Sequence, residues 1–164
     1  MRQNDLARII TALKPPIDDF VRESRVRIAL LINGSGQVLA QHGFTRSYEI
    51  MNVAALAAAA HVSARLLAQI TQAKRWTHLH HAGRERNFFL APVKTPVTDL
   101  ILVAIFDGDT SLGIVQLYFD RLGKAIGTLP EFQQELQQTS QLAFERDLEA
   151  GLRRVLSEQP RGED

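Results

Sequence analysis

Apolar and polar residues follow a helical period at the start of the chain. Between Asn4 and Ser24 one face of the expected helix is apolar, formed by Leu6, Ile10, Leu13, Ile17, Phe20 and Val21. Pro15 and Pro16 interrupt this segment, and an interior proline removes a hydrogen bond and clashes with the preceding turn. We therefore expect two short helices, or one kinked helix whose second part starts at Pro16. The apolar face keeps its phase across the break, so both parts should cover the same surface.

The next segment changes to the pattern of a β-hairpin. Residues 26–32 are short and rich in aliphatic side chains, which is typical of a strand. Asn33 and Gly34 follow, and this dipeptide is the strongest short-range hairpin signal. Residues 37–41 form the expected return strand.

The longest helical pattern covers residues 48–74, and six of the seven residues 54–60 are alanine. One face repeats at steps of three and four residues, and we expect it to lie on the sheet: Val53, Leu56, Ala60, Ser63, Leu67 and Ile70. A second, smaller apolar stripe comprises Ala55, Ala58, Ala59, Val62 and Leu66, with Arg65 and Gln69 close by. Burial inside the monomer is the alternative for this stripe, but it does not account for Val62 and Leu66. Since exposed apolar patches mark interfaces, we interpret the stripe as an interface.

Three further strands and a helix are expected downstream. Residues 76–82 and 87–93 are extended in pattern, and Leu100–Phe106 is continuously apolar, as in a central strand covered on both faces. Residues 110–126 are ambiguous because 114–119 are β-rich in composition. A helix is favoured because Leu112, Val115, Phe119, Leu122 and Ile126 fall on one helical face.

The sequence also contains capping signals for the start and the end of this helix, and for one more helix after it. Asp109 and Thr110 can cap the helix at its start and Gly127 can stop it. Thr128 and Glu131 then have the spacing of a capping box, with a proline tolerated between them. A last helix is therefore expected over residues 128–158, followed by a flexible polar tail over 159–164.

Composition excludes several classes of function. The 164 residues include 19 Lys and Arg and 18 Asp and Glu, so the net charge is +1. This balance argues against nonspecific binding of nucleic acid. The chain has no cysteine, which excludes disulfides, thiol catalysis and iron–sulfur clusters and fits a cytoplasmic protein. No secretory signal is visible, and the uninterrupted apolar runs are far shorter than the roughly 18 residues of a membrane span.

Candidate chemistry is sparse. The phosphate-binding pattern GxxxxGK[ST] and the nucleophile pattern GxSxG are both missing. His78, His80 and His81 could suggest a metal site. Two ligands from one strand would need a third ligand from elsewhere in the chain, and no residue is an evident candidate, so structural or interface roles are favoured. Asp107 and Asp109 could hold a cation, although a turn leading into a helix is the simpler interpretation. We expect no catalytic residue, no cofactor and no metal.

This element order resembles the roadblock family of small dimeric domains, and within it the MglB-like type. The most specific stretch is residues 100–119, LILVAIFDGDTSLGIVQLYF: a strand, then Phe-Asp, then Thr-Ser-Leu-Gly leading into an aliphatic helix. Residues 29–32 with 36–39 resemble the first hairpin of the family, and residues 67–70 the end of its long helix. His80 and His81 resemble a His followed by Glu or Gln on its third strand. The similarity extends over about residues 10–129.

The resemblance implies an α/β (α+β) fold of the roadblock/profilin-like type. Its antiparallel sheet has five strands in the order 2-1-5-4-3, with the long helix on one face and the first and last family helices on the other. The corresponding organisation is an N-terminal helical extension over 1–15, a roadblock domain over 16–127, and a C-terminal helical extension over 128–158.

The resemblance also implies a function. MglB-like dimers bind a Ras-like small GTPase, MglA-like, and stimulate GTP hydrolysis by remodelling its switch regions without an arginine finger, in the control of cell polarity and motility. The implied contact surface is the outer face of the long helix: Ala55, Ala58, Ala59, Val62, Arg65, Leu66 and Gln69. A homodimer would pair third strands and pack long helices together, through His78, His80, Ala58 and Ala59. The alternative is a non-activating adaptor that docks partners through the long helix and the C-terminal helix.

Overall fold

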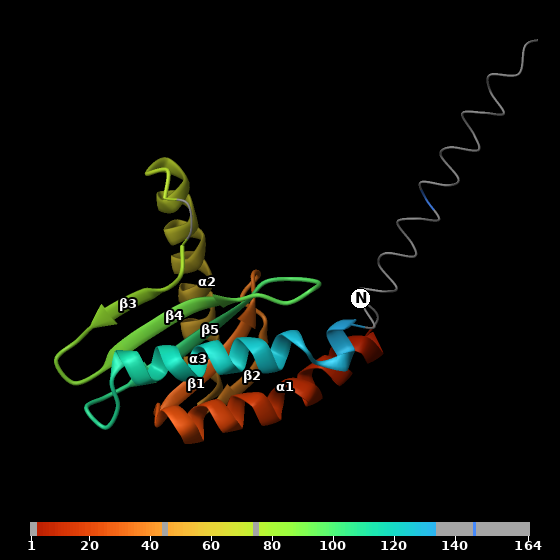
Figure 1. Ribbon diagram of the computed structural model, residues 1–164, viewed down its shortest axis with the longest axis horizontal. Coiled ribbons are helices and arrows are strands. Elements are labelled where there is room, and N and C mark those ends of the chain that lie inside the picture. Colours follow the sequence, from red (N-terminus) through yellow and green to blue (C-terminus); the bar gives the residue numbers. More distant parts are fainter. Residues whose placement is uncertain (1–2, 44–45, 74–75, 134–145, 147–164) are drawn as a thin grey trace, which may run out of the picture.

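One antiparallel sheet of five strands carries helices on both faces (Figure 1). The structure is a computed structural model that describes residues 3–43, 46–73, 76–133 and 146. In chain order its elements are α1 (Gln3–Ser24), β1 (Ile28–Asn33), β2 (Val38–His42), α2 (Ser47–Ile70), β3 (Leu79–Ala82), β4 (Asn87–Val93), β5 (Leu100–Phe106) and α3 (Leu112–Gly127). The strand order β2-β1-β5-β4-β3 confirms the roadblock/profilin-like sheet expected from the sequence.

β5 is the central strand, as its continuous apolar run predicted. It pairs with β1 on one side and with β4 on the other, and all seven of its residues are buried. Because both faces of a central strand are covered, apolar side chains are favoured at every position. β2 and β3 are left at the two edges of the sheet.

The first hairpin turns where the sequence predicted. The Asn33 side-chain oxygen accepts hydrogen bonds from the backbone N–H groups of Ser35 at 3.1 Å and Gln37 at 2.9 Å. Gly36 has a φ of +83°, a region that glycine enters without strain. This side-chain bonding fixes the turn and therefore the register of β1 against β2.

α1 is a single helix that runs through Pro15 and Pro16, so the expectation of two short helices is wrong. The helix persists because one continuous face packs on the sheet, formed by Ile9, Leu13, Ile17, Phe20 and Val21. Ile10, which the sequence pattern placed on that face, is exposed, and Ile9 is buried instead. The expected boundary between residues 15 and 16 lies inside this helix.

α3 confirms the helix favoured over residues 110–126, with Val115, Leu122 and Ile126 buried against the sheet. Its N-cap is Ser111, whose side chain accepts a hydrogen bond from the backbone N–H of Ile114, so the expected caps at Asp109 and Thr110 are wrong. Residues 130–133 are again helical. The rest of the last helix expected to residue 158, and the tail after it, lie outside the described residues, residue 146 apart.

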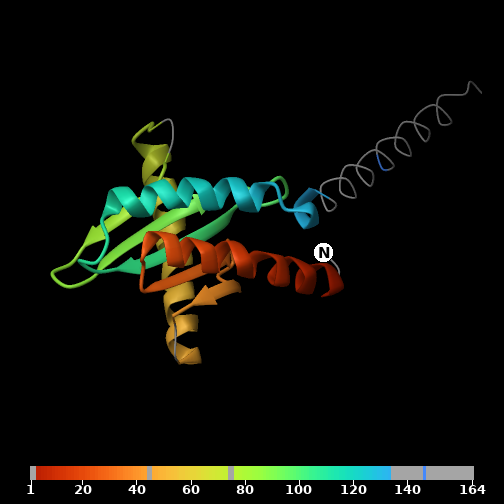
Figure 2. The same ribbon diagram turned by 60° about the horizontal axis from the view of Figure 1, so that its bottom comes forward.

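The two faces of the sheet are covered unequally (Figure 2). α1 and α3 lie side by side on one face and enclose the larger core. α2 alone crosses the other face, over a smaller core of Leu30, Ile32, Ala54, Ala57, Leu90, Ile101 and Val103. Much of the surface of α2 therefore meets solvent.

Candidate partner-binding surface

α2 contacts the sheet through its small side chains. Ala54 and Ala57 are buried, and Gly36 in the first hairpin lies under the same stretch of helix, where an added Cβ would be 3.6 Å from that of Ala58. Small residues allow the helix backbone to approach the sheet closely. The alanine run thus accounts for how α2 packs within the monomer.

The face of α2 that the sequence pattern assigned to the sheet is largely exposed, and that expectation is corrected. Leu56, Leu67 and Ile70 are 72%, 61% and 78% exposed, and we call these three residues the Leu56 flank. Ser63 is exposed too, and of the six assigned residues only Val53 and Ala60 are half-buried against the core. The helix is apolar on almost every side. The positions of its larger side chains therefore predicted the wrong face for the contact with the sheet.

The second stripe lies on the surface, as expected. Ala55, Ala59, Arg65 and Gln69 are exposed, while Val62 and Leu66 are 39% and 47% exposed. Ala58 differs, since it is half-buried and packs on the smaller core. We call Ala55, Ala59, Val62, Arg65, Leu66 and Gln69 the outer face of α2. Its role in binding a partner stays a prediction.

Apolar exposure continues from α2 onto the sheet. Leu79 on β3 and Phe88 on β4 are about two-fifths exposed. Phe88 is two residues from Leu90, which packs under α2, so the two share one face of the sheet. β3 pairs only with β4 among the described strands, which leaves its outer backbone edge open. An open strand edge next to exposed apolar side chains is a template for pairing with another chain.

α2 is also long and apolar enough to cross a membrane by length and composition. The segment Glu49–Ile70 reaches a mean hydropathy of 1.5, with 22% of the window buried in the structure. The expectation from the sequence considered uninterrupted apolar runs only, whereas this helix also contains polar residues. One such helix is weak evidence for a span, and packing through Ala54 and Ala57 places it on the sheet.

His78 and His80, expected at a dimer interface, turn toward the face of the sheet that carries α3. The His78 ring stacks on Phe89 with centroids 5.3 Å apart, and His80 lies 6.1 Å from Phe106. His78 Nε2 is 3.1 Å from the side-chain nitrogen of Gln116 in α3. Both histidines are half-buried, so their rings cover core aromatics while the β3 backbone forms the edge. Among the described residues, no group of three or more potential metal ligands gathers.

Asp107 and Asp109 bind Arg27 instead of presenting free carboxylates. Arg27 Nε donates to Asp107 at 2.7 Å, and its guanidinium also pairs with Asp109. The Asp107 side chain accepts from the backbone N–H of Asp109 at 3.0 Å. The hydrogen bond from Arg27 is the main reason that the pKa of Asp107 lies below its usual value. The arrangement is a turn between β5 and α3, the simpler of the two sequence interpretations.

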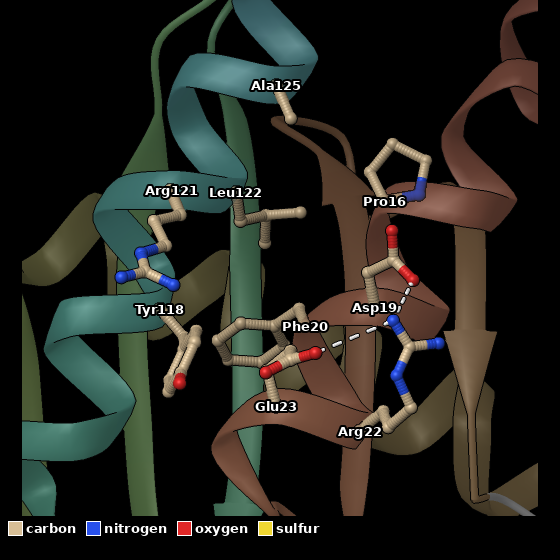
Figure 3. A pocket seen from close by; sticks show the side chains of 9 residues that line it. All are labelled: Pro16, Asp19, Phe20, Arg22, Glu23, Tyr118, Arg121, Leu122 and Ala125. Atoms are coloured by element: carbon tan, nitrogen blue, oxygen red, sulfur yellow. Dashed lines mark hydrogen bonds and ion pairs between the residues drawn. The ribbon is translucent and has the colours of Figure 1, made fainter.

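A hollow of about 300 Å³ lies between α1 and α3, on the face opposite α2 (Figure 3). Phe20 and Leu122 are the buried apolar residues of its lining. The Arg121 guanidinium is 4.9 Å from the Tyr118 ring centroid. Arg22 is paired with Asp19 at 2.6 Å and with Glu23 at 3.6 Å. Two basic and two acidic side chains thus line the hollow, and its charges balance.

A second hollow, of about 540 Å³, adjoins the outer face of α2. We call it the Trp76 hollow, and its lining is Gly34, His61, Val62, Arg65, Trp76, Pro92, Lys94, Thr98, Asp99 and Ile101. The His61 ring meets Trp76 edge to face, with centroids 4.9 Å apart. Burial, reinforced by nearby Arg65, lowers the pKa of His61. No sequence pattern pointed to this site, because its walls come from α2 and from segments that are distant from it along the chain.

Comparisons with known proteins agree on the fold. The family model described as Roadblock/LC7 domain matches residues 17–106, more than half of the chain. No curated protein is significantly similar in sequence. MglB from Myxococcus xanthus superposes with a TM-score of 0.63 at 20% identity, covering 77% of this chain and 90% of that one. The gliding protein MglB from Thermus thermophilus gives 0.62 at 23% identity, covering 82% and 95%. A structure of MglB in a tetrameric arrangement gives 0.61 at 23% identity, covering 82% and 94%.

Proposed function

Because the chain belongs to the Roadblock/LC7 family, we propose that it is a non-enzymatic, dimeric regulator that binds a Ras-like small GTPase of the MglA-like type. The observation that carries the proposal is the outer face of α2, a surface of small and apolar side chains around Val62 and Leu66 that the monomer leaves uncovered. Contiguous exposed apolar surface of this kind is typical of protein-binding sites.

The homodimer proposal is supported by further exposed apolar surface on α2, the Leu56 flank. On an α-helix each residue is turned by about 100° from the last, so Leu56 and Leu67 project about 80° and about 100° away from Leu66, whereas Ile70 is turned by only about 40°. The Leu56 flank therefore adjoins the outer face at Ile70 and diverges from it at Leu56 and Leu67. In the proposed dimer the second copy covers the Leu56 flank and pairs along β3, near His78 and His80, with Ala58 and Ala59 allowing close approach of the two helices. Apart from Ala59, the outer face then stays open to the GTPase.

The proposed mechanism is stimulation of GTP hydrolysis by positioning. In phosphoryl transfer most of the catalysis comes from placing groups that stabilise charge in the transition state. The docked surface of α2 would hold the switch regions of the GTPase so that the arginine and glutamine of the GTPase itself reach the γ-phosphate. No side chain of this chain acts as an arginine finger, and no cofactor or metal takes part.

The same surfaces suit a second function, a non-activating adaptor. It would use the same dimer and dock its partners through α2 and the segment after Thr128. Pro130–Gln133 begins a helical turn, and the buried Phe132 fixes this turn to the core. In either function the protein acts in the cytoplasm, without membrane insertion and without binding nucleic acid.

The decisive variant changes the outer face without touching the core. Val62→Arg combined with Leu66→Arg should leave the domain folded and abolish GTPase binding, because two guanidinium groups replace the apolar contact. Binding is measured by titration calorimetry against the GTP-loaded GTPase. The matched control is Ile114→Arg with Leu117→Arg on α3, where both side chains are about equally exposed but lie on the opposite side of the sheet.

Each outcome has one interpretation. Unfolding of the Val62 and Leu66 variant would mean that the outer face is core, and unchanged binding would place the contact elsewhere. Single-turnover GTP hydrolysis, with and without the chain, separates the two functions. An increased rate supports the activator, whereas an unchanged rate despite binding supports the adaptor.

A further inference from the structure

The Trp76 hollow combines apolar walls with an excess of positive charge. Trp76, Pro92 and Ile101 form apolar parts of its lining, and Arg65 and Lys94 add two cations. Asp99 is the one carboxylate among these described lining residues, and it already pairs with Lys94. Arg65 has no ion pair within the described part of the chain. The hollow therefore has room and charge for one more anionic group.

His61 adds an imidazole ring to the wall of the hollow. Its Nδ1 atom is buried, so the ring would act on a bound group through its charge and not through a hydrogen bond from that atom. The edge-to-face contact with Trp76 holds the imidazole in place.

We infer that the Trp76 hollow receives a glutamate side chain of the protein that docks on the outer face of α2. Val62 belongs both to that face and to the lining of the hollow, so a docked partner reaches the opening directly. The methylene groups of the glutamate would pack against Trp76 and Pro92. Its carboxylate would meet Arg65 and Lys94, beside the His61 ring. The inference rests on the proposed function only for the identity of the docked protein.

The same geometry gives the interaction a pH dependence. The charged groups that face His61 are Arg65 on its own helix and Lys94 and Asp99 on the connection between β4 and β5. Burial and then Arg65 lower the pKa of His61, so the free imidazole is neutral at pH 7. A bound carboxylate favours the imidazolium and raises that pKa. Affinity for the carboxylate should therefore rise as the pH falls through the raised pKa of the bound imidazole toward the lowered pKa of the free one.

A small probe tests the chemistry of the hollow without the GTPase. The full chain is titrated with N-acetyl-glutamate α-amide and with its neutral counterpart, N-acetyl-glutamine α-amide. Trp76 is the only tryptophan, so its fluorescence reports on the hollow directly, and amide resonances in NMR spectra locate the binding. We expect saturable binding of the glutamate probe only. Arg65→Gln combined with Lys94→Gln should weaken it about tenfold or more, since hydrogen bonds to charged groups are lost.

Two controls make the result specific. Arg121→Gln removes a cation from the other face of the sheet and should leave probe binding unchanged, whereas His61→Gln should remove the pH dependence and keep part of the affinity. Equal binding of both probes, or binding unaffected by loss of Arg65 and Lys94, would overturn the inference.

Binding of the GTPase provides a second test of the inference. Arg65→Gln with Lys94→Gln should weaken its binding about tenfold, and an unchanged affinity would overturn the inference even if the outer face binds. If the GTPase does not bind the parent chain although the glutamate probe does, the proposed function fails while the chemistry of the hollow stands.

Discussion

The sharpest prediction concerns the Leu56 flank, which the proposed dimer should bury. We replace Leu67 and Ile70 by aspartate. Full burial of such a side chain contributes about 2 kcal/mol, and these two are 61% and 78% exposed in the monomer. Completing their burial would stabilise the dimer by about 3 kcal/mol per protomer, and by about 6 kcal/mol in a twofold-symmetric pair.

This energy sets the size of the expected effect. Since about 1.4 kcal/mol corresponds to a factor of ten, losing it should weaken the dimer by about four orders of magnitude. Sedimentation equilibrium should then show a dimer for the parent chain at micromolar concentration and a monomer for the Leu67→Asp, Ile70→Asp variant. Circular dichroism should show an unchanged fold, because neither side chain contributes to a core.

The control variant introduces the same two negative charges at another place on the surface. Ile114→Asp with Leu117→Asp on α3 changes two side chains on the opposite face that are 43% and 51% exposed, and it should remain dimeric. The reasoning is refuted if the Leu67 and Ile70 variant dimerises as tightly as the parent. It is equally refuted if the parent chain is itself a monomer at micromolar concentration.

Two further predictions concern stability. Ala54→Leu should lower the free energy of unfolding by about 1–3 kcal/mol because it overpacks the contact between α2 and the sheet, whereas Ala55→Leu on the outer face should change it by less than about 0.5 kcal/mol; urea denaturation distinguishes the two, and equal effects would contradict the observed phase of α2. The pKa of Asp107 is lowered in the folded state, so its stabilising effect is present above its unfolded value of 3.8 and is lost as the pH falls through the folded value. Arg27→Gln should therefore reduce the dependence of stability on pH below about pH 4, and an unchanged slope in urea denaturation from about pH 2 to 5 would contradict this.

The sequence predicted the sheet well because its signals are local. Asn33 fixes the turn through its side-chain oxygen and Gly36 through its positive φ, and the apolar run of β5 indicates a strand covered on both faces. Strand order itself came from the family resemblance. Turn residues and short apolar runs act within a few positions, so they can be read without knowing the rest of the fold.

The phase of α2 could not be predicted because the helix is apolar on nearly every side. Hydrophobic periodicity then favours the large side chains for the core, yet a helix close to a sheet buries the small ones, here Ala54 and Ala57. The cap of α3 was missed because Asp109, Thr110 and Ser111 are all good caps, and only backbone geometry selects among them.

The Trp76 hollow lay beyond sequence reasoning for a different reason. Its walls come from the first hairpin, from α2 and Trp76, and from β4, β5 and the connection between them, which meet only after the sheet has formed. His61 looked like one more residue of an apolar helix, and Trp76 like the start of a strand. Their ring contact has no periodicity that a sequence pattern could show.

The central place of β5 also has a consequence for synthesis on the ribosome. β5 is the last strand of the sheet to be made, yet it joins β1 to β4, with Ile28 paired to Ile105 across most of the domain. Until residue 106 has emerged, the first hairpin and the β3–β4 hairpin have no strand between them. Pairings between residues far apart in sequence form slowly, and unpaired strand edges are prone to aggregate in the meantime. The first hairpin therefore waits for its central partner from residue 42 until residue 106 has emerged, and the alanine-rich α2 waits from residue 70 for a completed sheet to cover, whereas the β3–β4 hairpin waits only from residue 93.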